Sequence, residues 1–273
     1  MKAARFAYER PDKLADAVAL LGREDVLVKA MAGSQSLGPM LNLRLVQPEI
    51  LVDLTAIAAL RSVQDEGSSL LIGACVTHAA IEDGLVPDVT NGALRLVAGG
   101  IAYRAVRNRG TIGGSLAHAD PSADWMSALT AIGASILVEG PAGRREVPMP
   151  GFMLGTFETV LQPGEIIAAV RVPRLSPRAR FGYYKICRKT GEFAHAIGTV
   201  CLDPERGFAR LVIGATSSAP IVIDGDALAR NFDEGAVHEA MRSAPFAGSH
   251  YEMKIHAVAL RRAIAQATMP VTA

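Results

Sequence analysis

The prediction of the fold depends on one stretch, Gly110-Thr111-Ile112-Gly113-Gly114-Ser115. Two adjacent glycines between hydroxyl side chains let the backbone turn freely and bring its N–H groups close to an oxygen-rich ligand. Downstream, residues 120–124 include typical helix N-cap residues, and the apolar run 125–129 follows them. The stretch therefore predicts either an anion-binding loop or a glycine-rich turn between two helices, followed by a polar loop and a helix.

A second loop of small residues lies earlier in the chain. Ala32-Gly33-Ser34-Gln35-Ser36 follows the apolar run 25–31 and precedes a short helical stretch that ends near Asn42. A strand, a small-residue turn and a helix start, in this order, present a helix N-terminus to a phosphate. Residues 32–36, the first loop, and residues 110–115, the second loop, can together clamp a pyrophosphate.

Composition limits the class of protein. The chain has 273 residues, half of them hydrophobic, and 28 basic against 27 acidic residues give a net charge of +1. This balance argues against nucleic acid or an anionic membrane as the main partner. The N-terminal residues are too polar for a signal peptide, and the apolar run 128–138 is shorter than the ~18 residues that span a bilayer. We expect a cytoplasmic protein without membrane insertion.

Metal-ligand patterns and the two commonest nucleotide-loop signatures are absent from the sequence. The three cysteines, Cys75, Cys187 and Cys201, are too far apart for a disulfide framework or a metal-ligand pattern. Neither a Gly-x-Gly-x-x-Gly after a strand nor a P-loop occurs, and there is no Gly-x-Ser-x-Gly elbow. His118, His195 and the other histidines are scattered and are interpreted as structural. No catalytic residue and no metal ligand is therefore assigned.

The order of strand-like and helix-like segments divides the chain into three units. Residues 1–55 read as a small α/β unit with parallel pairing, and residues 56–173 as a second α/β unit that carries the second loop. In the second unit one helical stretch, 92–106, leads into that loop. Prolines bracket the linker 173–177, and residues 178–273 contain three strand-like runs followed by helices.

Five segments together resemble the FAD-binding medium subunit of the molybdenum hydroxylases, the xanthine dehydrogenase and carbon monoxide dehydrogenase family. They occur in the family's order over nearly the whole chain, and the pair of glycine loops is the most specific part. The segments are Ala32 to Ser36, Arg107-Asn108-Arg109 with the second loop, Asp120 to Asp124, Pro163-Gly164-Glu165-Ile166-Ile167, and Arg188-Lys189-Thr190-Gly191-Glu192-Phe193-Ala194.

The resemblance implies an α+β fold. Two α/β parts enclose FAD, and a C-terminal domain contains three antiparallel strands and a helical bundle. In this family the two loops meet at the FAD pyrophosphate, which assigns that role here to Ala32, Gly33, Ser34, Gln35, Ser36, Thr111, Gly113, Gly114 and Ser115.

Four more contacts to FAD are implied by the resemblance alone. Asp124 corresponds to an acidic residue near the ribityl or ribose hydroxyls, and Ile167 to an apolar contact. Lys185 corresponds to a basic residue near the flavin, and Phe193 to an aromatic side chain beside the isoalloxazine ring. For each of these four residues a purely structural role, in the core or on the surface, is the alternative.

Two positions depart from the family pattern. Ser34 replaces the second glycine of the first loop, and a left-handed backbone would cost a side chain there on the order of 1 kcal/mol. We therefore expect FAD to be held less tightly. Ser115 stands where asparagine is frequent, and its hydroxyl can still bind phosphate or loop backbone.

The implied function is that of a flavin electron-transfer subunit, which accepts electrons from iron–sulfur clusters and passes them to an external acceptor. Because the chain has no ligand set for a cluster or for molybdenum, the [2Fe-2S] clusters and the molybdenum cofactor are expected on a small and a large partner subunit, in a dimer of heterotrimers. Two alternatives stay open: a free-standing FAD-dependent oxidoreductase, and a scaffold subunit without cofactor. The substrate and the final acceptor are not indicated.

Overall fold

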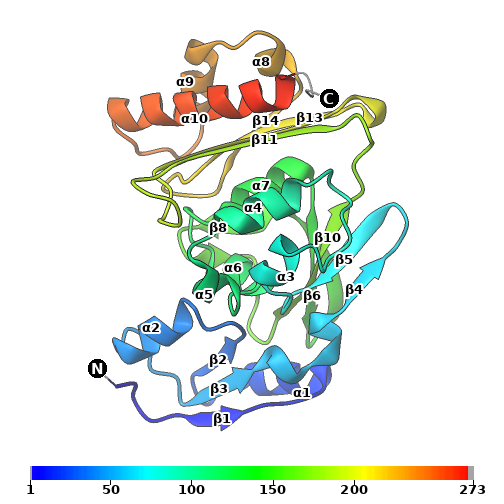
Figure 1. Cartoon of the computed structure of the whole chain (residues 1–273). Coiled ribbons are helices and arrows are strands. Elements are labelled where there is room, and N and C mark those ends of the chain that lie inside the picture. The colour runs from blue at the N-terminus through cyan, green and yellow to red at the C-terminus, as the bar shows by residue number, and fades with distance from the viewer. Residues whose placement is uncertain (1, 270–273) are drawn as a thin grey trace.

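Short apolar strands alternate with helices at the N-terminal end and form a three-stranded parallel sheet. The computed structural model describes residues 2–269, and in it β3 lies between β1 and β2, both parallel to it, as the sequence predicts (Figure 1). The helix α1 buries Ala17 and Val18 in the small core of this unit. Its elements are β1 (Ala7–Glu9), α1 (Leu14–Leu21), β2 (Val28–Met31), α2 (Leu37–Asn42), β3 (Ile50–Asp53) and the 3-10 turns η1 (Leu54–Ala56) and η2 (Ala58–Arg61).

The middle of the chain builds a five-stranded antiparallel sheet in the order β4-β5-β10-β6-β7. Its central strand β10 is almost entirely buried, which fits its apolar sequence. The strands are β4 (Val63–Asp65), β5 (Ser69–Gly73), β6 (Ser135–Gly140), β7 (Gly143–Pro148) and β10 (Ile166–Pro173). A turn η3 (Met149–Gly151) and a small hairpin of β8 (Met153–Gly155) and β9 (Glu158–Thr159) precede β10.

Five helices cover this middle sheet. They are α3 (His78–Glu82), α4 (Ala93–Gly100), α5 (Arg104–Arg107), α6 (Ile112–His118) and α7 (Asp124–Ile132). The single helix expected over 92–106 is wrong, because α4 and α5 are separate. Ala102 has a left-handed backbone with φ of +42°, which an α-helix does not allow, so the chain turns between them.

The C-terminal sheet is antiparallel, as the resemblance implies, but it has four strands instead of three. The additional strand β14 (Ile221–Asp224) is a four-residue edge strand, too short to show a clear alternation in the sequence. The other strands are β11 (Arg180–Ile186), β12 (Ala196–Asp203) and β13 (Phe208–Gly214), with the turn η4 (Pro204–Arg206) after β12. Three helices follow, α8 (Ala227–Arg230), α9 (Glu234–Ser243) and α10 (His250–Thr268). The α+β class of the fold is confirmed.

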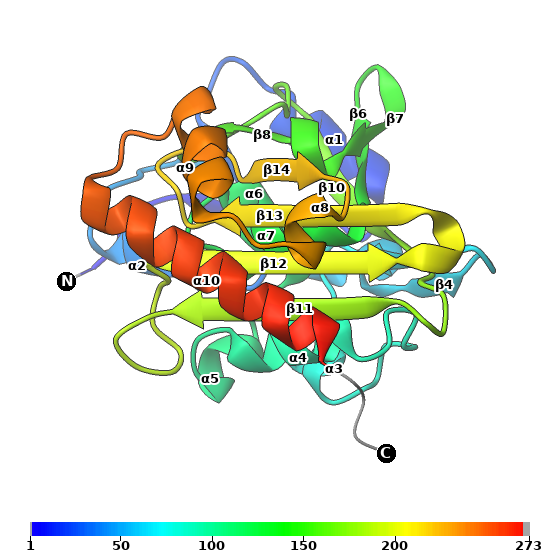
Figure 2. The same cartoon turned by 90° about the horizontal axis from the view of Figure 1, so that it is seen from above.

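Helices cover the C-terminal sheet on both faces. The 19-residue helix α10 crosses the strands on the outer face (Figure 2), where Gly182 lets the α10 backbone approach: a Cβ there would lie 1.9 Å from the Ala263 carbonyl oxygen. On the inner face α7 packs against β12 and β13, and Cys201 and Val212 belong to the same core cluster as the middle sheet. Within residues 2–269, no helix is both long and apolar enough to cross a membrane.

Candidate functional site

The two loops are in direct contact, although some seventy residues of sequence separate them. A Cβ placed on Gly33 would lie 2.0 Å from the carbonyl oxygen of Arg109, so only glycine fits where the first loop crosses the second. A Cβ on Gly114 would lie 3.9 Å from the Ala32 Cβ, an ordinary contact distance. The structure thus brings the two predicted loops together into one site.

The second loop differs in conformation from the prediction. Its glycines do not form a freely turning loop that leads into polar chain, because residues 112–118 are the helix α6. Thr111 is its N-cap, and the Thr111 hydroxyl oxygen accepts a hydrogen bond from the Gly114 N–H at 3.1 Å. Gly113 is required by close packing, since a Cβ there would lie 2.4 Å from the Ala74 Cβ. The glycines therefore serve to seat α6 tightly on the sheet.

The backbone N–H groups of residues 112–115 in the second loop are already used within the chain. The N–H of Ile112 donates to the Val76 carbonyl at 3.0 Å and that of Gly113 to the Ala74 carbonyl at 2.9 Å. The N–H of Ser115 donates to the Thr111 carbonyl at 3.0 Å. Besides the N–H of Thr111, which has no acceptor within residues 2–269, this loop can offer a ligand the hydroxyl protons of Thr111 and Ser115.

In the first loop, by contrast, the backbone N–H groups are not used by the fold. Within the described residues, the backbone N–H groups of Gly33, Ser34, Gln35 and Ser36 donate to no protein acceptor. The Gln35 side chain donates to the Gly33 carbonyl at 3.0 Å and braces the turn. Successive free N–H groups at the start of a helix form a favourable site for an anion.

The backbone of Ser34 is left-handed, which is the conformation in which a serine in place of the family's glycine is strained. Its φ is +60°, a value that costs a residue with a side chain on the order of 1 kcal/mol relative to glycine. The strain expected for this position is present.

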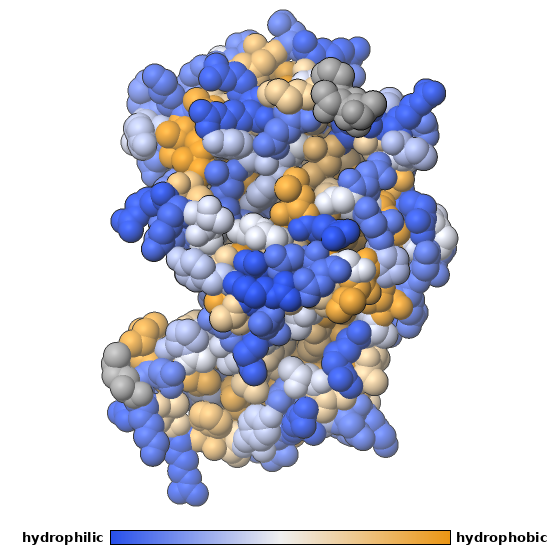
Figure 3. Space-filling model, viewed as in Figure 1, coloured by the Kyte–Doolittle hydropathy of each residue, from blue (hydrophilic) through white to orange (hydrophobic). Residues whose placement is uncertain are grey.

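The surface is hollowed beside the two loops. Figure 3 shows a notch between the part of the molecule that holds α2 and the part above it, on the side where α2 and α5 face each other in Figure 1. The first loop ends at the start of α2, and the second loop begins after the end of α5. The hollow therefore lies near the ends of α2 and α5 that adjoin the two loops.

His78 is hydrogen-bonded to the start of the second loop. The backbone N–H of His78 donates to the Gly110 carbonyl at 2.9 Å, and its imidazole Nδ1 accepts a hydrogen bond from Trp125 Nε1 at 3.1 Å. Burial, helped by the nearby positive charge of Arg107, lowers the pKa of His78 to about 4. The imidazole is therefore neutral at pH 7, as the bond from Trp125 requires.

Asp124, at the start of α7, and Lys185, on β11, form a contact between the middle unit and the C-terminal sheet. Lys185 Nζ donates to Asp124 Oδ1 at 2.7 Å and to the Gly100 carbonyl at 2.9 Å. The Tyr183 hydroxyl also donates to Asp124 Oδ1. Burial and the neighbouring carboxylate raise the pKa of Tyr183 well above 10, so the phenol stays protonated and remains a donor.

The two other predicted contacts lie in different surroundings. Ile167, on β10, is 5% exposed and packs in the central core. Phe193 is 72% exposed, on the loop between β11 and β12. That loop touches the α4–α5 turn, because a Cβ on Gly191 would lie 2.7 Å from the Ala102 carbonyl oxygen. The roles of both residues toward the cofactor stay predictions.

Sequence reasoning did not find Tyr183 and His78. Tyr183 could have been found, because it lies two residues before Lys185 on the same strand and the two side chains therefore lie on the same face of the sheet. His78 gives no such signal, because its partners Gly110 and Trp125 are distant in sequence.

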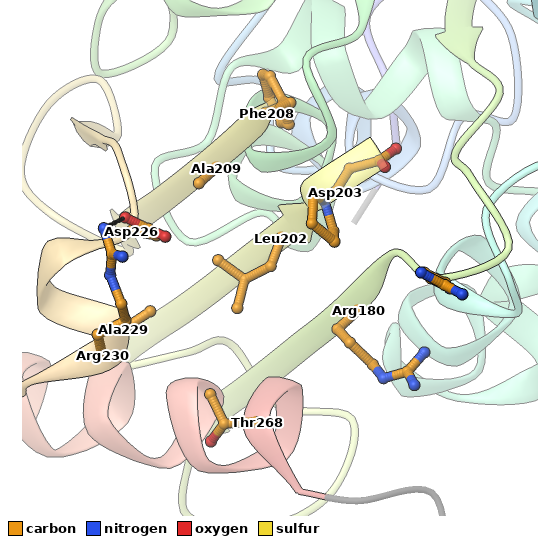
Figure 4. A pocket seen from close by; sticks show the side chains of 11 residues that line it. Arg180, Leu202, Asp203, Phe208, Ala209, Asp226, Ala229, Arg230 and Thr268 are labelled. Atoms are coloured by element: carbon orange, nitrogen blue, oxygen red, sulfur yellow. Dashed lines mark hydrogen bonds and ion pairs between the residues drawn. The ribbon is translucent and has the colours of Figure 1, made fainter. Parts of the chain in front are cut away.

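A cavity of about 250 Å³ lies elsewhere, where β11 begins, β12 ends and β13 begins in the C-terminal sheet (Figure 4). Arg180, Asp203 and Arg230 are among its lining residues, but Arg230 pairs with Asp226, and Asp203 binds Ser176. The cavity contains no residue of the predicted site. In the described part of the chain, no three His, Cys, Asp or Glu side chains are grouped so that they could hold a metal ion.

The chain belongs to the family described as the FAD binding domain in molybdopterin dehydrogenase, whose model matches residues 4–175. It is thus an FAD-binding subunit of the molybdenum hydroxylase family and an oxidoreductase component. The matched range includes both loops and Asp124, and it ends before Tyr183 and Lys185.

Two relatives and one solved structure are similar to the chain over most of its length. The carbon monoxide dehydrogenase medium chain of Hydrogenophaga pseudoflava is 37% identical over 246 residues, which cover 88% of this chain and 86% of that one. The medium chain from Afipia carboxidovorans is 35% identical and covers 96% of both chains. A crystallised Hydrogenophaga pseudoflava carbon monoxide dehydrogenase that lacks the Mo-pyranopterin moiety matches with a TM-score of 0.84, at 34% identity and 98% coverage of both chains.

Replacing Ser34 with glycine should stabilise the protein. Because the backbone at residue 34 is left-handed, Ser34→Gly is expected to raise the free energy of unfolding by about 1 kcal/mol, measured by urea denaturation. Ser36→Gly is the matched control, since Ser36 has a φ of −102° and glycine gains nothing there. Equal destabilisation by both changes would show that Ser34 is not strained.

Proposed function

We propose that the first and second loops hold the pyrophosphate of FAD between them. The observation that carries this proposal is the direct contact of Gly33 with the Arg109 backbone, which brings the N–H groups of residues 33–36 near the loop that holds the hydroxyls of Thr111 and Ser115. A diphosphate requires many hydrogen-bond donors in a small volume, and this is the chemistry that the two loops offer.

The two loops contribute different kinds of hydrogen-bond donor to the pyrophosphate. The N–H groups of residues 33–36 donate to the phosphate oxygens, because they have no partner among the described residues. The hydroxyls of Thr111 and Ser115 donate from the other side, since the N–H groups of α6 are used in the fold. Backbone donors from both loops were expected, and the arrangement of α6 argues for hydroxyls at the second loop instead.

The other residues that we propose to contact FAD lie within the middle unit or at its boundary with the C-terminal sheet. Asp124 accepts from a sugar hydroxyl of FAD, and Lys185 Nζ donates to the same carboxylate at 2.7 Å. Ile167 supplies apolar support, and Phe193 lies beside the isoalloxazine ring. We further propose that residues 1–55 and 56–173 are the two parts of an FAD-binding domain and that residues 178–273 form a C-terminal domain.

The bound FAD supplies electron-transfer chemistry. The chain's part is to bind the cofactor, orient it and leave one edge of it accessible to a protein partner. By analogy with the relatives, which are medium chains of carbon monoxide dehydrogenases, electrons come from an iron–sulfur small subunit and originate at a molybdenum large subunit. The complex is a cytoplasmic dimer of heterotrimers that passes electrons to an external acceptor.

Gly114→Val should weaken FAD binding and leave the fold intact. A side chain at residue 114 fills the space between Thr111 Oγ1, 2.8 Å from the added Cβ, and Ala32. Loss of one or two charge-assisted hydrogen bonds should raise the dissociation constant at least about tenfold, measured by titrating the apoprotein with FAD and following flavin fluorescence. Gly151→Val, in open space, is the control. Unchanged affinity in the Gly114 variant would rule out this pyrophosphate site.

The isolated chain should bind FAD but oxidise no substrate by itself. Carbon monoxide, the substrate in the relatives' names, is the first to test. Flavin absorbance should bleach on its addition only when the chain is co-purified with its small and large subunits. Bleaching in the isolated chain would instead show a free-standing flavoenzyme, and a chain that binds no FAD would show a scaffold.

A further inference from the structure

The two oxygens of the Asp124 carboxylate differ in the hydrogen bonds that they accept. Both Lys185 Nζ and the Tyr183 hydroxyl donate to Oδ1. No residue in the range 2–269 donates to Oδ2, and this oxygen is not among the buried polar atoms that lack both solvent and a partner. Asp124 as a whole is only 9% exposed. A largely buried carboxylate thus keeps one oxygen available.

This asymmetry depends on Tyr183. A lysine alone can bridge both oxygens of a carboxylate, because its ammonium group is a compact point charge with rotatable donors. Lys185 is also tied to the Gly100 carbonyl at 2.9 Å, which limits how far it can follow a rotating carboxylate. The phenol of Tyr183 is held by β11 and donates from a fixed direction, so its bond opposes rotation about the Cβ–Cγ bond of Asp124.

We propose that Tyr183 is a positioning residue for the cofactor: its bond to Oδ1 of Asp124 keeps Oδ2 turned to accept a hydrogen bond from a sugar hydroxyl of FAD. Tyr183 itself does not touch the cofactor. The proposal rests on the FAD site proposed above and adds a residue that lies outside both loops.

The strand offers a matched control in the next residue. Tyr184 faces the opposite side of the sheet, where its hydroxyl accepts a hydrogen bond from Arg262, whose guanidinium lies 4.8 Å from the ring centroid. Tyr184→Phe therefore removes the same atom from the same strand, on the face toward α10. Only the Tyr183 hydroxyl points to Asp124.

The test is a double-mutant cycle in FAD affinity. Tyr183→Phe keeps the ring, and the urea midpoint of the apoprotein checks that it folds. We expect the FAD dissociation constant to rise about threefold to tenfold in Tyr183→Phe and to stay unchanged in Tyr184→Phe. In an Asp124→Asn background, Tyr183→Phe should have no further effect, because the residue acts only through the carboxylate.

The outcomes separate the failure of this inference from failure of the FAD site. If the unmodified chain binds no FAD, the site itself is wrong. If it binds FAD and Tyr183→Phe binds equally well, Tyr183 has no positioning role. An equal loss of affinity with Asp124 and with Asn at residue 124 would overturn the inference too, since it would show that Tyr183 acts through packing or direct contact.

Discussion

The structure depends on the crossing of two backbones, where Gly33 lies against the carbonyl of Arg109. Any side chain at residue 33 would occupy the space of the second loop and separate the parallel sheet from the middle unit. The crossing brings the four unbonded N–H groups of residues 33–36 near the loop that holds the hydroxyls of Thr111 and Ser115. The diphosphate site proposed here thus relies on uncharged donors, since neither loop contains a charged side chain.

A second constraint connects the middle unit to the C-terminal sheet. The buried ion pair between Asp124 and Lys185 joins the start of α7 to β11, and each partner would be an uncompensated buried charge without the other. Such a pair adds little net stability, but it fixes the geometry of the groups around it. Here the pair shares its carboxylate oxygen, Oδ1 of Asp124, with the hydroxyl of Tyr183 at the edge of the proposed site.

The sequence carried enough information for the class of fold and for the pairing of the loops, because loop order and small residues survive as local patterns. It did not reveal that α6 begins at Ile112, since Gly113 is required by Ala74, a contact between distant residues. Asp124 and Lys185 were predicted separately, and their mutual bond was not. The break at Ala102 and the edge strand β14 were missed for a related reason: neighbouring elements, and not local propensity, determine them.

The most direct measurement of the central claim is a crystal structure of the chain with FAD. The account predicts that the diphosphate lies within hydrogen-bond distance of the N–H groups of residues 33–36 and of the Thr111 hydroxyl, with a sugar hydroxyl on Asp124 Oδ2. A diphosphate bound away from the crossing of the two loops, or one held only by charged side chains elsewhere, would contradict it.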